Sequence, residues 1–156
     1  MSESLEFRPV EGDEVHAFAD TLADLCAAAF HSFDGSYLLN RLPGLSGVAA
    51  VVALEKGAPI AFKLGYRRGH DLFYSWLGAV HPLWRRKGVA RRLMEAQHRW
   101  ANEQGYRFVE TRTRASNTPM IILNLSAGFV ISGYEVDRAG HPVVTQRRNL
   151  SAGPVL

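Results

Sequence analysis

Cysteine is almost absent from this chain, because Cys26 is the only one among 156 residues. No disulfide can therefore form within the chain, and the alanine-rich helical pattern around Cys26 is typical of a buried structural residue rather than a nucleophile. Long hydrophobic runs are also missing, since no apolar stretch approaches the roughly 18 residues that a membrane-spanning helix needs. The acidic N-terminus lacks the basic and then apolar pattern of a signal peptide. We therefore expect a cytoplasmic protein that does not associate with a membrane.

Basic residues are scarce in the first 40 positions, where Arg8 is the only one. The same segment has eight acidic residues, namely Glu3, Glu6, Glu11, Asp13, Glu14, Asp20, Asp24 and Asp34. Beyond it bases predominate, and the net charge is +3. A basic C-terminal part could attract nucleic acid, but the sequence has no helix-turn-helix, no zinc-ligand spacing and no aromatic sheet motif. A nucleic-acid-binding domain is therefore a remote alternative.

The rest of the composition predicts one folded domain over residues 1–156, since 47% of the residues are apolar and the length is typical of a single core. Apolar and β-branched runs predict strands over residues 5–9, 48–55, 59–66, 72–80, 106–113, 129–136 and 142–147. Helical spacing predicts helices over residues 13–30, 35–42, 89–102 and 117–128.

This order of elements predicts an α/β fold with a mixed sheet. One strand is followed by two helices, three strands, a helix, a strand, a helix and two strands. We expect six or seven mostly antiparallel strands with helices on both faces. The strand at 72–80, the helix at 89–102 and the strand at 106–113 should form a right-handed crossover.

The turn between residues 85 and 90 is the most informative segment of the chain. It reads Arg85-Arg86-Lys87-Gly88-Val89-Ala90 and joins a predicted strand to a predicted helix. Backbone N–H groups at a helix start have no partner within the helix, and the helix dipole adds positive charge there. Gly88 allows close approach of a ligand. A solvated basic turn is the alternative, but the placement favours a site for a di- or triphosphate.

Several motifs together resemble the GNAT superfamily of acyl-CoA-dependent N-acetyltransferases. They are Leu77-Gly78-Ala79-Val80-His81-Pro82, the turn at 85–90, Asn117 with Met120, Leu123 and Asn124, and Gly128-Phe129. Each is weak alone, but they occur in the family's order and at ordinary spacing. The resemblance covers residues 48–148, whereas the first 45 residues match in pattern only.

The resemblance implies acetyl-CoA as acyl donor and no metal ion. Ala79 and Val80 would lie where the family's fourth strand bulges and offers backbone groups to the pantetheine arm. A backbone N–H near Val80 would polarise the thioester carbonyl. Asn117 would bond the cofactor, unless it is a plain helix cap. The pyrophosphate would be held by Arg85, Arg86, Lys87, Gly88, Val89, Ala90 and Arg91.

The catalytic residues implied by the resemblance depart from the family pattern. Many relatives have a tyrosine that protonates the leaving thiolate, and here that position is Asn124, which has no proton to give near neutral pH. Some relatives have a base at the position of Tyr74, but tyrosine with an ordinary pKa near 10 is a poor base. Glu110, Asp34 or a water molecule are the remaining candidates for the base.

The acceptor implied is a primary amine, either a small molecule or a protein amino group. Tyr74 and Trp76 suit the walls of an acceptor pocket, and the segment 30–42 adds Asp34 and Tyr37, which would suit a cationic amine. Packing in the core is the alternative role for these aromatics. The missing tyrosine leaves open a binding module that senses acyl-CoA without turnover. The closing hairpins of this family often meet a partner subunit, which implies a homodimer.

Overall fold

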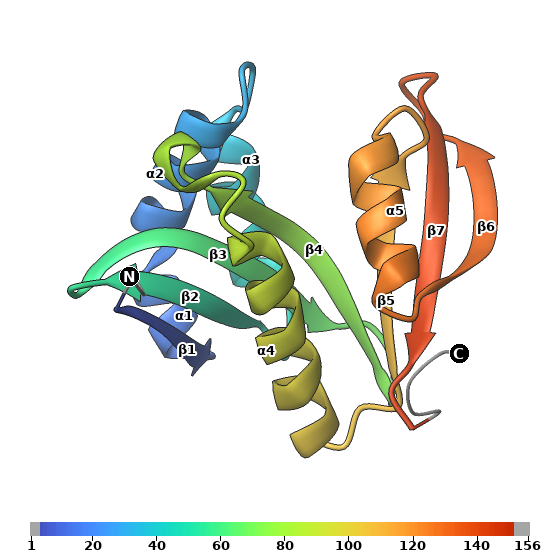
Figure 1. The fold of residues 1–156 in the computed structure, drawn as a ribbon. Coiled ribbons are helices and arrows are strands. Elements are labelled where there is room, and N and C mark those ends of the chain that lie inside the picture. Colours follow the sequence, from blue (N-terminus) through green and yellow to red (C-terminus); the bar gives the residue numbers. More distant parts are fainter. Residues whose placement is uncertain (1–3, 152–156) are drawn as a thin grey trace.

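The computed structural model describes residues 4–151 and contains one seven-stranded sheet flanked by helices (Figure 1). The strands are β1 (Leu5–Glu11), β2 (Ala49–Glu55), β3 (Ala58–Arg67), β4 (Leu72–Val80), β5 (Phe108–Arg114), β6 (Val130–Val136) and β7 (Pro142–Asn149). The helices are α1 (Asp13–Ala17), α2 (Ala19–Ala29), α3 (Gly35–Arg41), α4 (Val89–Glu103) and α5 (Thr118–Ser126), with short 3-10 turns at Leu42–Gly44 and Pro82–Trp84.

The predicted mixed sheet and its helical layers are confirmed. Its strand order is β1-β2-β3-β4-β5-β7-β6, and every neighbouring pair is antiparallel except β4 with β5. Helices α2 and α3 cover one face, while α4 and α5 lie on the other (Figure 1). The described helices do not include one long and apolar enough to cross a membrane.

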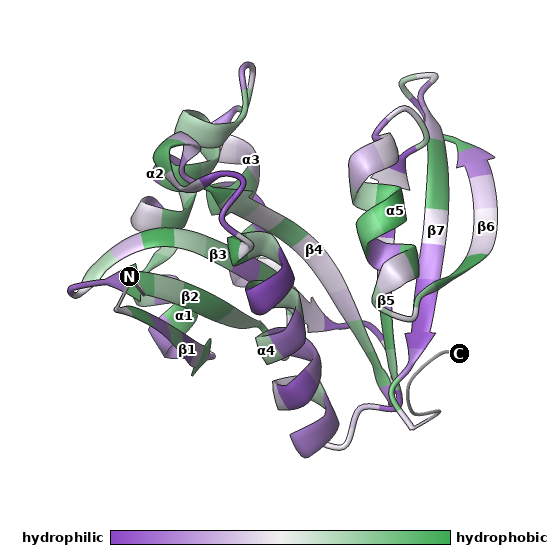
Figure 2. Ribbon diagram, viewed as in Figure 1, coloured by the Kyte–Doolittle hydropathy of each residue, from purple (hydrophilic) through white to green (hydrophobic). Residues whose placement is uncertain are grey.

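The core lies on both faces of β2 and β3, which explains why these strands are continuously apolar rather than alternating. Ala50, Val52 and Leu54 pack toward α2, and Val51 and Ala53 pack toward α4. Hydropathy follows the same layers, because β2 and β3 are hydrophobic along most of their length (Figure 2). The outer face of α4 is strongly hydrophilic (Figure 2), as its amphipathic spacing predicts.

The single helix expected over residues 13–30 is instead two helices. Phe18 interrupts it, because its N–H donates to the carbonyl of Val15, three residues back, at 3.0 Å. The backbone of Phe18 has φ −90° and ψ −1°, outside the ordinary α-helical values. A helical turn that is tightened in this way needs no glycine or proline. The apolar spacing on either side of Phe18 therefore gave no sign of the break.

Strands β4 and β5 pair over only four residues and then separate. Pairing ends at Ser75 with Thr111, where the Thr111 hydroxyl donates to the carbonyl of Ser75 at 3.0 Å. Beyond this point β4 continues to Val80 and β5 to Arg114 without pairing with each other. The two ribbons diverge toward the end where α4 begins (Figure 1). We call this region the parting of β4 and β5.

A β-bulge at Trp76 coincides with the parting. Leu64 faces Leu77 on β4, but its neighbour Gly65 faces Ser75, so Trp76 is the extra residue. The resemblance implied that the bulge of this strand lies at Ala79 and Val80. That position was wrong, because Ala79 and Val80 pair regularly with Phe62 and Ala61. The bulge turns Trp76 and Leu77 to the same face, and both pack against the cluster under α2 and α3.

Gly65, beside the bulge, leaves no room for a side chain. A Cβ there would clash with the carbonyl oxygen of Tyr74 and with the ring of Phe73. We expect Gly65→Ala to lower the free energy of unfolding by about 2–3 kcal/mol, the usual cost of overpacking. Gly133→Ala on β6 is the matched control, because its Cβ would meet Thr145 at an ordinary 3.5 Å. Urea unfolding of both variants checks this, and equal stabilities would contradict it.

Candidate active site

The turn before α4 presents a row of backbone N–H groups. Gly88 caps the helix in the left-handed region with φ 76°, and Arg86 also has a positive φ of 61°. Within residues 4–151, no acceptor bonds the N–H groups of residues 86–91, and the first paired amide of α4 is that of Arg92. A Cβ on Gly88 would meet no atom within 4 Å. The start of this 15-residue helix is therefore open to an anion.

The cationic side chains of the turn have different surroundings. Arg85 donates to the carbonyl of Ala29 at 2.6 Å and so satisfies the C-terminal end of α2. Lys87 lies 5.6 Å from the ring of Trp84. Arg86 is exposed and has no carboxylate partner among residues 4–151. The backbone and Arg86 are therefore freer to meet a ligand than the Arg85 side chain is.

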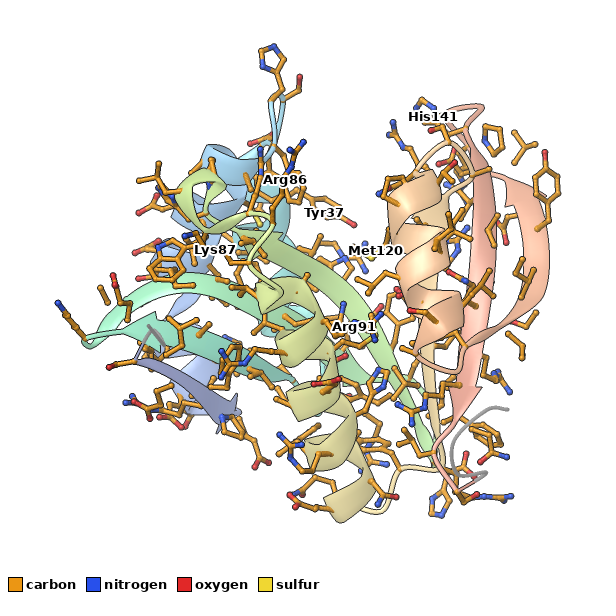
Figure 3. The ribbon with its side chains drawn as sticks, in the orientation of Figure 1. Tyr37, Arg86, Lys87, Arg91, Met120 and His141 are labelled. Carbon is orange, nitrogen blue, oxygen red and sulfur yellow. The ribbon has the colours of Figure 1, made fainter. Side chains whose placement is uncertain are left out.

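Arg91 connects the two sides of the parting. Its guanidinium donates to the hydroxyl of Ser126, the last residue of α5, at 2.7 Å. Figure 3 shows Arg91 reaching from α4 toward α5, and Met120 on the side of α5 that faces β4. Arg86 and Lys87 surround the start of α4, and Tyr37 projects at the wide end of the parting (Figure 3).

The two asparagines of α5 differ in environment. Asn117 is exposed and caps α5, because its side-chain oxygen accepts from the N–H of Met120 at 3.3 Å. Asn124 is buried, and its amide donates to Gln146 on β7 at 2.9 Å. Gln146 in turn donates to the carbonyl of Ile121 at 3.2 Å. Asn124 therefore fixes α5 on the sheet, as a buried amide with a satisfied donor.

A polar cluster that the sequence analysis missed lies beneath α4. His98 is buried, and its Nδ1 lies 2.7 Å from the guanidinium of Arg148 on β7. A guanidinium can only donate, so Nδ1 accepts and the ring proton is on Nε2. This Nε2 and both side-chain polar atoms of Gln97 are buried without a partner among the described residues. Burial, with the nearby charges of Arg148 and Lys63, lowers the pKa of His98 to about 3.

Lys63 is the fourth member of this cluster. It pairs with Val51 and Gly78, on the face of the sheet that α4 covers. Its Cγ would lie 3.6 Å from a Cβ on Gly78, so the lysine stem passes over β4 where that strand has no side chain. Burial lowers the pKa of Lys63 to about 8. The signal in the sequence was a lysine inside the apolar run 59–66.

On the opposite face, four aromatic rings meet at the parting. Tyr66 on β3 lies 5.4 Å from Tyr74 and 5.9 Å from Trp76, both on β4. Tyr37 on α3 lies 5.8 Å from Trp76 in an edge-to-face arrangement. Burial raises the pKa of Tyr74 further above its ordinary value, so this phenol is held in its neutral form. The structure thus groups Tyr37, Tyr74 and Trp76, three of the residues assigned to the acceptor side.

Glu110 lies beside these rings on β5, opposite Tyr74. Its two oxygens have different partners, since Oε1 is 2.9 Å from Arg147 and Oε2 is 3.8 Å from Arg68. Asp34 has a local task instead, because it caps α3 by accepting from the N–H and the hydroxyl of Ser36 at 3.0 and 2.8 Å. These hydrogen bonds lower the pKa of Asp34.

The family model described as the Acetyltransferase (GNAT) family matches residues 17–129, which is more than half of the chain. The chain belongs to the GNAT acetyltransferase family. No curated protein matches its sequence.

Solved structures of GNAT acetyltransferases share the fold. The ribosomal-protein-S18-alanine N-acetyltransferase of Escherichia coli is 18% identical, with a TM-score of 0.77 over 97% of this chain and 98% of that one. Ard1 of Thermoplasma volcanium is 20% identical, with a TM-score of 0.76 over 94% and 97%. A chain of the NatC complex bound to Gag peptide and CoA is 17% identical, with a TM-score of 0.72 over 94% and 99%.

The parting is also distinct from a shallow pocket of about 420 Å³ near the other end of α4. That pocket is lined by Glu11, Arg67, Trp100 and Tyr106, among others. Trp100 lies 11 residues beyond Val89 along the helix, which places the pocket roughly 16 Å from the open amides at 1.5 Å per residue. The pocket is therefore separate from the open amides of the turn.

Lys63→Met removes the half-buried ammonium from this GNAT fold. The pKa of Lys63 is about 8 when folded against an ordinary 10.5, so the unfolded chain binds more protons between these two pH values. The lysine therefore destabilises the fold below pH 8, and this cost is relieved as the pH rises to 10.5. We expect the variant to melt about 3–8 °C higher at pH 7.

The difference in melting temperature between variant and parent should shrink from pH 8 to pH 10.5, as followed by circular dichroism. Lys56→Met, at the exposed β2–β3 turn, is the control and should leave the melting temperature unchanged at every pH. A difference for Lys63→Met that does not depend on pH would contradict the assignment of a lysine whose pKa is lowered in the folded protein.

Proposed function

We propose that this chain is an N-acetyltransferase that moves an acetyl group from acetyl-CoA to a primary amine. One observation carries the proposal: the unpartnered N–H groups of residues 86–91 lie at the start of α4, beside the parting of β4 and β5. A helix start of this kind suits a pyrophosphate. The unpaired edge of β4 suits an amide-rich arm that adds to the sheet as a strand would.

The residues present fit acetyl-CoA. The amides of residues 86–91 and the Arg86 side chain would hold the pyrophosphate, and Gly88 leaves the space for it. Arg91, which already spans from α4 to α5, and the cap residue Asn117 would flank it. Beyond Ser75, the backbone of β4 at Ala79 and Val80 pairs with β3 only. When bound, acetyl-CoA supplies an acetyl group activated as a thioester.

The acceptor amine would approach from the face of Tyr74 and Trp76. Transfer forms a carbon–nitrogen bond and breaks a carbon–sulfur bond, so one proton must leave the amine and one must reach the sulfur. Glu110 is our candidate for accepting the amine proton, directly or through water. Its Oε2 is the available atom, because its contact with Arg68 is the longer of the two ion pairs at 3.8 Å.

Lys63 is our candidate for the proton on the sulfur side. Asn124 has none to give, and its amide is committed to Gln146. Lys63 lies on the α4 face, and its stem crosses β4 at Gly78. With its pKa lowered to about 8, Nζ can both hold and release a proton near neutral pH. An ordinary thiol has a similar pKa, near 8.5, so the transfer would be close to balanced.

Gly88→Asp tests the cofactor site. The substitution places a carboxylate among the open amides, so we expect acetyl-CoA affinity to fall at least about tenfold in isothermal titration. Gly57→Asp is the matched control, because Gly57 also has a positive φ and no atom within 4 Å of its Cβ position. The control should bind within threefold of the parent, roughly the scatter of such measurements. Unchanged binding by Gly88→Asp would remove the turn from the site.

Glu110→Gln tests the proposed base. At low pH the acceptor is mostly an ammonium and needs a proton acceptor, so the rate should fall more at low than at high pH. Glu135→Gln is the control, because Glu135 is likewise ion-paired to an arginine, at 2.9 Å from Arg112, but lies on β6. An unchanged pH profile would exclude Glu110. Acetyl-CoA binding without thiol release for any amine would instead indicate a binding module.

A further inference from the structure

The acceptor side of the parting carries positive charge on an aromatic floor. The floor consists of Tyr37, Tyr66, Tyr74 and Trp76, whose rings follow one another at 5.4–5.9 Å between centroids. Because the bulge lies at Trp76, this floor begins where β4 leaves β5. A planar or apolar group can stack on such rings, since Tyr37 is 45% exposed and Trp76 is half-buried.

Two guanidiniums lie over rings of the floor. Arg41, at the end of α3, lies 5.6 Å from the ring of Tyr37 and 5.6 Å from the ring of Trp76. Arg68, after β3, lies 4.5 Å from the ring of Tyr74. Stacking on an aromatic ring orients a guanidinium but does not neutralise it. Its N–H donors remain able to meet a carboxylate, often with two parallel hydrogen bonds.

The acids nearby do not balance these cations. Among residues 4–151, no carboxylate pairs with Arg41. Arg68 shares Glu110 with Arg147, at 3.8 Å against 2.9 Å, so one carboxylate serves two guanidiniums. Asp34, the acid expected beside the aromatics, is committed to the cap of α3. Glu110 is therefore the one carboxylate that the described residues place among Arg41, Arg68 and Arg147, and the net charge beside the floor is positive.

We propose that the acceptor carries a carboxylate beside its amine, as amino acids and their close analogues do. This rests on the proposed acetyl transfer and names its substrate class. Arg41 and Arg68 would bind the carboxylate while the side chain of the acceptor stacks on Trp76 and Tyr37. The same positive potential disfavours the ammonium form of the acceptor, so it increases the fraction of free amine that can attack. A purely cationic amine would be repelled.

Matched pairs of acceptors test the charge preference. Phenylalanine with phenethylamine, and tryptophan with tryptamine, differ only in the carboxylate. Thiol release should show kcat/KM at least about tenfold higher for the amino acid in each pair, the effect expected of one charged hydrogen-bonding group. An equal or higher value for the decarboxylated amine would overturn the proposal. Aminophosphonic acids with the same side chains carry a phosphonate in place of the carboxylate and so test which anion is bound. A higher kcat/KM for them than for the amino acids would also overturn the proposal.

Two substitutions test whether the preference for a carboxylate comes from these arginines, namely Arg41→Met and Arg68→Met. Each should raise KM for the amino acid at least about tenfold, leave KM for its decarboxylated partner unchanged or lower, and leave acetyl-CoA affinity within twofold. Arg99→Met is the control, because Arg99 is exposed on the outer face of α4 and should change none of these values. Quenching of tryptophan fluorescence by the amino acid, without acetyl-CoA, gives a second measure of binding. Variants that behave like Arg99→Met would overturn the assignment.

The outcomes separate this inference from the function on which it rests. If acetyl-CoA fails to bind in titration, the proposed acetyl transfer falls. If acetyl-CoA binds and amines are acetylated without regard to a carboxylate, only the acceptor class is wrong. Peptides with a free N-terminus but an amidated C-terminus are the last group of acceptors to be tested. Their preference over every free amino acid would indicate a protein acceptor and would overturn the small-molecule assignment.

Discussion

The arrangement of this molecule depends on where β4 and β5 stop pairing. Four residue pairs hold these parallel strands together, and the bulge at Trp76 begins directly after the last of them. Parallel neighbours in a sheet normally continue to share hydrogen bonds. Within residues 4–151, the edge of β4 beyond Ser75 pairs with no strand on the side away from β3, and a ligand with amides of its own could pair with it as a strand would.

The two faces of the sheet divide the chemistry between backbone and side chains. On the α4 face the open amides of residues 86–91 offer fixed donors, and the same face holds the buried Gln97 and His98 with the half-buried Lys63 and Arg148. On the other face, aromatic rings and guanidiniums supply shape and charge. Backbone donors need no particular side chain, whereas recognition of an acceptor does. A site for the acyl donor that uses backbone groups can therefore be common to many sequences with this fold, whereas a site for the acceptor that uses side chains is particular to each sequence.

Much of the fold followed from local patterns. Apolar and β-branched runs, the turn glycines and the helix spacings predict every strand and the helices on both faces of the sheet, and the family assignment from the ordered motifs is confirmed. The break at Phe18 and the bulge at Trp76 were not predictable, because they depend on which backbone groups face each other after folding. The open turn was visible in the sequence, since strand, glycine and helix are adjacent there.

The side-chain contacts of the site were harder to predict. Arg85 meets a carbonyl 56 residues away, and Glu110 meets Arg147, 37 residues away. Asp34 caps α3 through one of its carboxylate oxygens, and this contact depends on how the chain folds around Ser36. Arg41 was not singled out because an arginine near a helix end is usually solvated. Lys63 interrupts an apolar run, which was a readable sign of an unusual environment.

The contact between Arg91 and Ser126 has a consequence for the whole domain. β5, α5, β7 and β6 form a unit that joins the other strands through a short parallel ladder, with the apolar cluster around Phe73, Trp100 and Phe129 behind it. The 2.7 Å bond adds a side-chain contact between α4 and α5, which lie on the two sides of the parting. An arginine has enough donors to hold a hydroxyl and an anion together. A ligand that binds Arg91 would therefore also contact the residue that links α4 to α5 across the parting.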